Sequence, residues 1–87
     1  MMAGMSEYTT PFVAAKGGVM TDDAGVITGE LELRTTLEPG GVVLVRVRYA
    51  GAKDWYRIRA ADATLHDERD LRALHTSLLG VLNRPTG

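Results

Sequence analysis

The sequence predicts an α+β fold: an antiparallel three-stranded meander, with a possible short extra N-terminal strand, packed on one C-terminal helix. Two observations predict it. Across residues 27–60, apolar and polar side chains alternate with a period of two between glycine-containing breaks, which is typical of half-buried strands. Residues 71–82 instead repeat leucine and valine at spacings of three and four, which is typical of an amphipathic helix.

Three strands account for the alternating region. They are expected over residues 27–37, 42–49 and 54–60. Glu38-Pro39-Gly40-Gly41 separates the first strand from the second, and Gly51-Ala52 separates the second from the third. Because both breaks are short, and a two-residue loop that starts with glycine suits a hairpin, consecutive strands should pair as an antiparallel meander.

The C-terminal helix follows an acidic stretch of the chain. Thr64 or Asp67 can cap its N-terminus, and Pro85 ends the apolar repeat. Its apolar stripe should cover one face of the sheet and close a single core. The residues expected to be buried together are Leu31, Leu33, Val43, Val45, Val47, Ile58, Leu71, Leu74 and Leu78.

A chain of 87 residues allows one small domain. We expect residues 1–10 to form a mobile tail and residues 11–87 to form the domain. Within the domain, residues 12–15 or 19–20 could form a brief edge strand. The longest apolar run, residues 42–45, is too short for a membrane span; with no leader sequence expected, the predicted location is the cytoplasm.

The parity of the strands puts a basic and aromatic group of side chains on the sheet face away from the core. These candidate binding residues are Arg46, Arg48, Trp55, Arg57 and Arg59. A cationic sheet face with an aromatic ring is typical of proteins that bind single-stranded nucleic acid. The chain as a whole does not favour a polyanion, however, because ten basic and eleven acidic residues leave a net charge of −1.

An internal ion-pair network is a competing interpretation of this face. If a five-residue loop over residues 37–41 joins the first two strands, Glu32 faces Arg46. In the same register Glu30 faces Arg48. Each opposite-charge pair would contribute about 0.2–1 kcal/mol and would cancel part of the positive charge.

The Gly51-Ala52 hairpin makes a second set of pairings. It places Arg48 opposite Trp55, which suits a cation–π contact, and Arg46 opposite Arg57. Two like charges directly opposite each other are unfavourable, so a carboxylate or an anionic partner should lie between these arginines, and Glu32 could serve both. We therefore rank an internal network first, a protein-binding surface second and a nucleic-acid surface third.

Candidate catalytic and metal-binding groups are sparse. The chain has no cysteine, which excludes disulfides, thiolate ligands and cysteine nucleophiles. His66 and His75 are nine positions apart and do not have the spacing of a metal-ligating pair. The acidic pairs at residues 22–23 and 67–68 fit a turn and a helix start. No catalytic residue, metal or cofactor is assigned.

The sequence favours a small non-enzymatic interaction or regulatory domain that acts through homodimerisation or through another protein. A dimer is expected through the helix flank or an edge strand, because a three-stranded sheet leaves two unpaired edges. The alternative is a nucleic-acid-binding module that uses the arginine and tryptophan face. A second alternative is a small enzyme with an acid–base site between subunits, built from His66 and His75.

Overall fold

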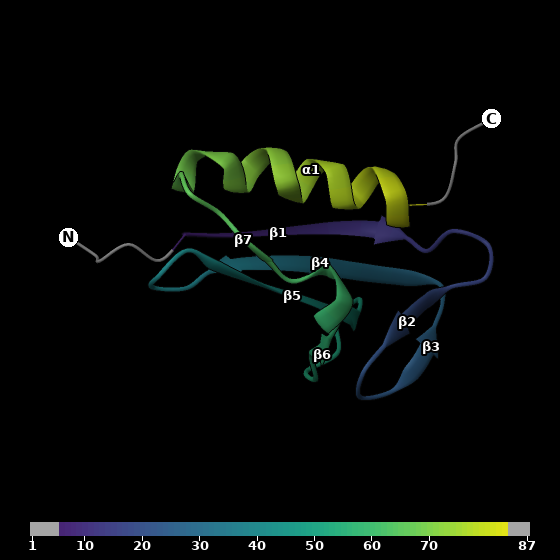
Figure 1. The fold of residues 1–87 in the computed structure, drawn as a ribbon. Helices are drawn as coiled ribbons and strands as arrows, with labels where there is room; N and C mark the ends of the chain where they lie inside the picture. The colour runs from purple at the N-terminus through teal and green to yellow at the C-terminus, as the bar shows by residue number, and fades with distance from the viewer. Residues whose placement is uncertain (1–5, 84–87) are drawn as a thin grey trace.

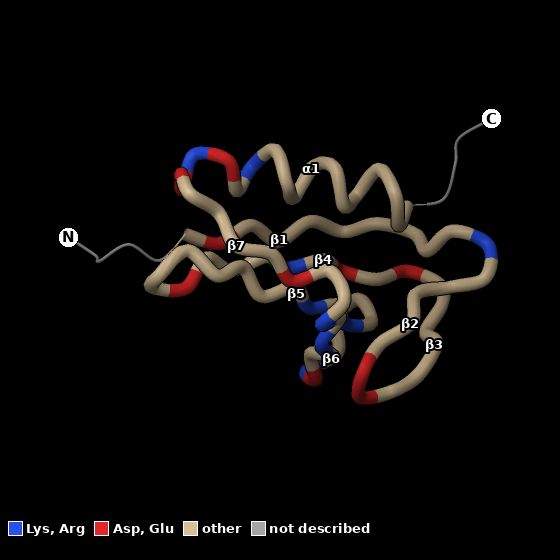
Figure 2. Tube along the Cα trace, in the orientation of Figure 1, with Lys and Arg blue, Asp and Glu red and all other residues tan. Residues whose placement is uncertain are grey.

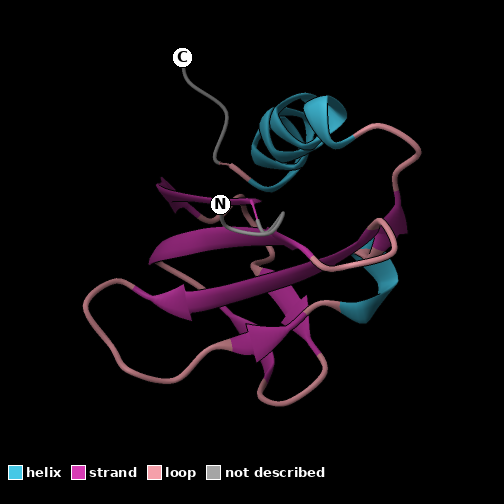
Figure 3. Cartoon of the chain, turned by 90° about the vertical axis from the view of Figure 1, so that its left-hand side faces the viewer, coloured by secondary structure: helices cyan, strands magenta, loops and turns pink. Residues whose placement is uncertain are grey.

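The computed structural model describes residues 6–83. Its elements are β1 (Ser6–Val13), β2 (Val19–Thr21), β3 (Gly25–Ile27), β4 (Glu30–Leu37), β5 (Val42–Tyr49), β6 (Tyr56–Arg57), the 3₁₀ helix η1 (Arg59–Ala61), β7 (Ala63–Thr64), the 3₁₀ helix η2 (Glu68–Asp70) and α1 (Leu71–Leu82). The antiparallel sheet runs in the order β1-β4-β5-β6, and β7 also pairs with β5. Helix α1 lies on one side of this sheet (Figures 1 and 3). The separate β2-β3 hairpin lies at the lower right of Figure 1. The predicted α+β class is confirmed.

The N-terminal segment forms a longer strand than the sequence predicts. β1 pairs with β4 along its whole length, from Ser6 opposite Leu37 to Val13 opposite Glu30. Residues 6–10, expected in the mobile tail, are therefore part of the sheet, whereas residues 1–5 lie outside the described residues. The first residues of β1 are mostly polar, so the sequence pattern does not indicate a strand there. They can be polar because only the inner face of an edge strand needs to be buried.

The strand expected over residues 27–37 is two strands. β3 ends at Ile27 and β4 begins at Glu30, and between them Gly29 has a φ of 91°, a left-handed conformation that favours glycine. The side chain of Ile27 remains buried, as the alternating pattern predicts, but it belongs to the β2-β3 hairpin. The pattern of burial thus continues across a break in the backbone pairing.

The register predicted between the strand over residues 27–37 and the strand over residues 42–49, which are joined in the structure as β4 and β5, is wrong by two residues. Glu38 and Val42 close a three-residue loop, through a hydrogen bond from Glu38 N to Val42 O of 2.7 Å. Leu37 stays in β4 because it is buried in the core and pairs with Val43. A shift of two residues leaves every side chain on its predicted face but changes its partner across the strands.

The third strand of the meander is shorter than predicted. β6 contains only Tyr56 and Arg57, and the chain then enters η1. The turn before it is centred on Ala50 and Gly51, with Ala52 N donating to Tyr49 O at 2.9 Å, one residue earlier than predicted. The predicted pairing of Arg46 with Arg57 is nevertheless confirmed.

The core lies between α1 and the sheet. Its buried apolar residues are Phe12, Ala14, Val19, Ile27, Leu31, Leu33, Leu37, Val43, Val45, Val47 and Leu71. Ile58, Leu74 and Leu78, which were expected inside, are only partly buried and pack against this core. Helix α1 packs mainly on β1 and β4, and its buried positions are Leu71 and His75.

Candidate functional site

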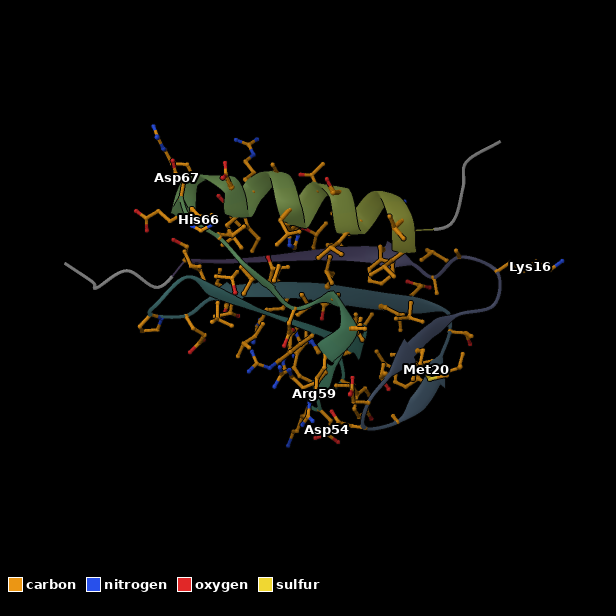
Figure 4. All side chains as sticks on the ribbon, viewed as in Figure 1. Lys16, Met20, Asp54, Arg59, His66 and Asp67 are labelled. Atoms are coloured by element: carbon orange, nitrogen blue, oxygen red, sulfur yellow. The ribbon has the colours of Figure 1, made fainter. Side chains whose placement is uncertain are left out.

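The predicted binding residues lie mainly on the sheet face away from α1. In Figure 2, the basic segments of β5 and β6 lie close together. Arg46 and Arg48 alternate with buried residues of β5, and Arg57 follows Tyr56, which pairs with buried Val47. Arg59 is different: it starts η1, and its side chain is 68% exposed (Figure 4). We call the face formed by the outward-facing residues of β4, β5 and β6 the outer face.

A row of three arginines crosses the outer face. Arg34 of β4 is directly opposite Arg46 of β5, and Arg46 is directly opposite Arg57 of β6. The sequence reasoning missed Arg34 because it depended on a register that is two residues out. Directly opposed side chains have Cβ atoms about 4.5–5.5 Å apart, so the three arginines leave the sheet as neighbours.

Trp55 is held by two of the arginines on this face. The guanidinium carbon of Arg34 lies 4.0 Å from the centre of its ring, and that of Arg48 lies 4.4 Å from it. The predicted contact between Arg48 and Trp55 is therefore confirmed, and Arg34 adds a second contact. A guanidinium group over an indole ring is attracted by the electron-rich ring face.

Three arginines on the outer face have carboxylate partners. Arg48 pairs with Glu32 at 2.5 Å, Arg57 pairs with Asp62 at 2.5 Å, and Arg34 lies 3.5 Å from Glu7. Glu32 therefore serves Arg48, and the expectation that it serves Arg46 and Arg57 is wrong because of the register shift.

Arg46 stands in the middle of the row without such a partner. Its side chain makes no ion pair or hydrogen bond within residues 6–83, although it is half-buried between two other arginines. In the neighbouring Arg57, Nε is shielded from solvent and its N–H has no hydrogen-bond acceptor in the described part of the chain. The row thus contains one positive charge without a counterion and one N–H donor without an acceptor.

Asp62 fixes one end of the row to the sheet. One carboxylate oxygen accepts a hydrogen bond from the backbone N–H of Val45 at 3.0 Å, and the other binds Arg57. We expect Asp62→Ala to lower the free energy of unfolding by about 1–3 kcal/mol, because it leaves both donors without their acceptor. Chemical denaturation measures this change.

Asp54 provides the matched control for Asp62. Its side chain is exposed and has no ion-pair or hydrogen-bond partner in the described residues (Figure 4). Asp54→Ala should change the free energy of unfolding by less than about 0.5 kcal/mol. Similar losses in the two variants would mean that Asp62 does not anchor the row.

Contacts from other parts of the chain occupy part of each edge of the sheet. At the β1 edge, Asn83 Oδ1 accepts the N–H of Val13 at 3.2 Å, and Pro11 has no N–H to offer. At the β6 edge, Asp22 N donates to Arg57 O, and the Asp23 carboxylate accepts the N–H of Arg57, both at 2.9 Å. These contacts reduce the number of backbone groups that another strand could pair with.

His75 lies inside the fold rather than at a surface. Its Nε2 is 2.9 Å from the hydroxyl of Thr10 in β1, and its Nδ1 is 2.8 Å from the hydroxyl of Thr35 in β4. The ring of Tyr8 packs beside it, with the ring centres 5.6 Å apart. Burial lowers the pKa of His75 below its usual value, because the charged form loses contact with water.

His66 lies in a different environment, just before η2 (Figure 4). It helps to line a pocket of about 300 Å³ between the β4-β5 loop and the start of η2, together with Leu37, Glu38, Pro39, Gly40, Gly41, Leu65 and Glu68. Nearby, Asp67 accepts hydrogen bonds from Arg69, which hold the pKa of the Asp67 carboxyl below its usual value. Within one chain, His66 lies at this pocket, whereas His75 lies between α1 and the strands β1 and β4.

Comparison with known proteins finds no match to a family, to a curated protein or to a solved structure. Within residues 6–83, no group of three or more histidine and carboxylate side chains is arranged to hold a metal ion. In the same part of the chain, no helix has the length and apolar character that crossing a bilayer requires. The outer face is therefore the feature from which a function can be argued.

Proposed function

We propose that this protein is a small non-enzymatic interaction domain whose outer face binds a protein, either a second copy of itself or a different chain. The observation that carries the proposal is Arg46, a half-buried guanidinium without an anion in a row of arginines. Two apolar side chains of β5 lie on the same face as Arg46: Leu44, which is half-buried, and Val42, which is 40% exposed. Arginine and aromatic residues beside apolar ones are typical of protein interfaces.

We favour the outer face over the edges of the sheet as the surface that contacts a partner. The contacts of Asn83 and Pro11 at β1, and of Asp22 and Asp23 at β6, leave few backbone donors for strand pairing. Helix α1 packs on the opposite side of the sheet from the outer face (Figure 1). We therefore propose the outer face in place of the edge-strand or helix-flank dimer that the sequence suggested.

A nucleic-acid-binding module is the alternative, and two observations rank it second. Arg34, Arg48 and Arg57 each have a carboxylate partner, so most of the positive charge is already compensated. The ring of Trp55 is already in contact with two guanidinium groups, which a stacking base would have to displace. Binding to a single-stranded oligonucleotide that weakens steeply with salt would favour this alternative.

Photo-crosslinking in the expressing cell tests the proposal. A crosslinking amino acid at position 44, on the outer face, should capture a protein, and Arg46→Glu in the same chain should abolish this capture. The matched control places the same amino acid at position 77, where Ser77 is exposed on α1. Equal adducts from both positions, or an adduct that Arg46→Glu does not affect, would contradict the proposal.

The mass of the particle in solution distinguishes the two kinds of protein partner. Light scattering that gives twice the chain mass of 9.4 kDa, with adducts of the same size, would identify a second copy. A mass of 9.4 kDa that persists on concentration, with larger adducts, would identify a different protein.

A further inference from the structure

We propose that Arg46 and Arg57 together form a binding site for one carboxylate group carried by the partner. This inference rests on the proposed function, because it names the chemistry that the outer face recognises. It starts from two observations on this directly opposed pair: Arg46 has no anion within residues 6–83, and Arg57 Nε has no acceptor there. One anionic group with two oxygen atoms can pair with Arg46 and accept the Nε–H of Arg57.

The charge of the surrounding face selects a monoanion. Arg34, Arg48 and Arg57 are compensated by Glu7, Glu32 and Asp62, which leaves about one positive charge, that of Arg46. A carboxylate carries one negative charge and matches it. A phosphate group carries almost two near pH 7 and would add repulsion from the three carboxylates.

The shape of the donors points the same way. A guanidinium group presents its N–H donors in a flat fork, and a flat carboxylate accepts two of them in parallel. Although Arg57 gives Nη2 to Asp62, its side chain remains 26% exposed. Its Nε is shielded from solvent in the free protein, so the guanidinium group must turn outward for this donor to meet the carboxylate.

The residue next to Arg46 on this face indicates which side chain of the partner should lie beside the carboxylate. Leu44 is two positions from Arg46 on β5, so both side chains project from the same face about 7 Å apart. An extended peptide has the same repeat between alternate side chains. A partner segment with an acidic residue and, two positions later, an apolar residue therefore fits Arg46 and Leu44 together.

Nuclear magnetic resonance of the full chain tests this site with a defined probe. The probe is the peptide acetyl-Ser-Glu-Ser-Leu-Ser-amide, and its control has Gln in place of Glu. We expect the Nε–H signals of Arg46 and Arg57 to shift and saturate with the Glu peptide but not with the Gln peptide. Arg46→Gln should weaken the binding at least tenfold, whereas Arg72→Gln, at an exposed position on α1, should not change it.

The alternative outcomes are decisive. Equal binding of the Gln peptide, shifts that never saturate, or full affinity in Arg46→Gln would overturn the carboxylate site. Inorganic phosphate that saturates the same two signals at a lower concentration than acetate would overturn the choice of a carboxylate. If photo-crosslinking at position 44 still depends on Arg46 while the peptide does not bind, this site fails and the interaction domain stands.

Arg46→Gln is expected to fold, which keeps this test interpretable. Arg46 makes no ion pair or hydrogen bond that the variant would lose in residues 6–83, and removing it relieves repulsion in the row. The thermal midpoint of the free variant should therefore equal or exceed that of the unmodified protein. A marked fall would show that Arg46 already has an anionic partner within the chain, and would also overturn the site.

Discussion

Replacing Leu71 with alanine is expected to lower the free energy of unfolding by about 2–5 kcal/mol. Leu71 is the first residue of α1 and is only 1% exposed, within the core between the helix and the sheet. The substitution removes buried methyl groups and leaves a cavity that its neighbours fill only in part. Because small domains are stable by only about 5–15 kcal/mol, this is a large share of the total. Urea denaturation followed by circular dichroism measures the loss.

Val81 supplies the control on the same helix. It is 76% exposed, so Val81→Ala removes almost no buried surface and should change the free energy of unfolding by less than about 0.5 kcal/mol. A silent Leu71→Ala, or equal losses at both positions, would mean that α1 does not pack on β1 and β4 through this face.

Acidification below about pH 6.5 is expected to destabilise the protein through His75, the second large effect. Burial lowers the pKa of His75 in the folded state below its value of 6.5 in an unfolded chain. Below pH 6.5 the unfolded chain therefore binds a proton that the folded protein does not. The stability is fully present above pH 6.5 and falls as the pH drops, by up to about 1.4 kcal/mol per pH unit, until the folded pKa is passed.

Two glutamine variants separate this effect from the titration of carboxylates. Glutamine at position 75 cannot titrate, so in His75→Gln the slope of stability against pH just below 6.5 should decrease by the contribution of His75. His66→Gln, at an exposed position just before η2, is the control for replacing a histidine as such. Equal slopes in the unmodified protein and in His75→Gln would show that burial does not depress this pKa.

The interior position of His75 could not be assigned from its spacing alone. It lies four residues after Leu71, on the inner stripe of α1, and this spacing places it near the core without showing how deeply it is buried. Two threonines from different strands make its burial tolerable, because Thr10 and Thr35 satisfy both ring nitrogens. The two threonines are brought together only by the pairing of β1 with β4, which the sequence pattern did not predict.

The outer face was predicted in its composition but not in its pairing. Parity alone put Arg46, Arg48 and Arg57 on one side, and the contact of Arg48 with Trp55 followed from the hairpin. The partner of Glu32 was wrong because one loop is shorter than expected. An error of two residues leaves parity intact, so it changes every cross-strand contact while leaving every face correct.

The sequence by itself determined the α+β class, the bounds of β5, the single C-terminal helix and the side of the sheet on which the arginines lie. These follow from local periodicity, since burial of one face repeats every two residues in a strand and every three to four in a helix. Only the tertiary structure decided that residues 6–13 complete the sheet, that α1 covers β1 and β4, and that Arg46 has no ion-pair partner among residues 6–83. Those features depend on which strand lies beside which and in what register, and contacts between residues distant in the chain set both.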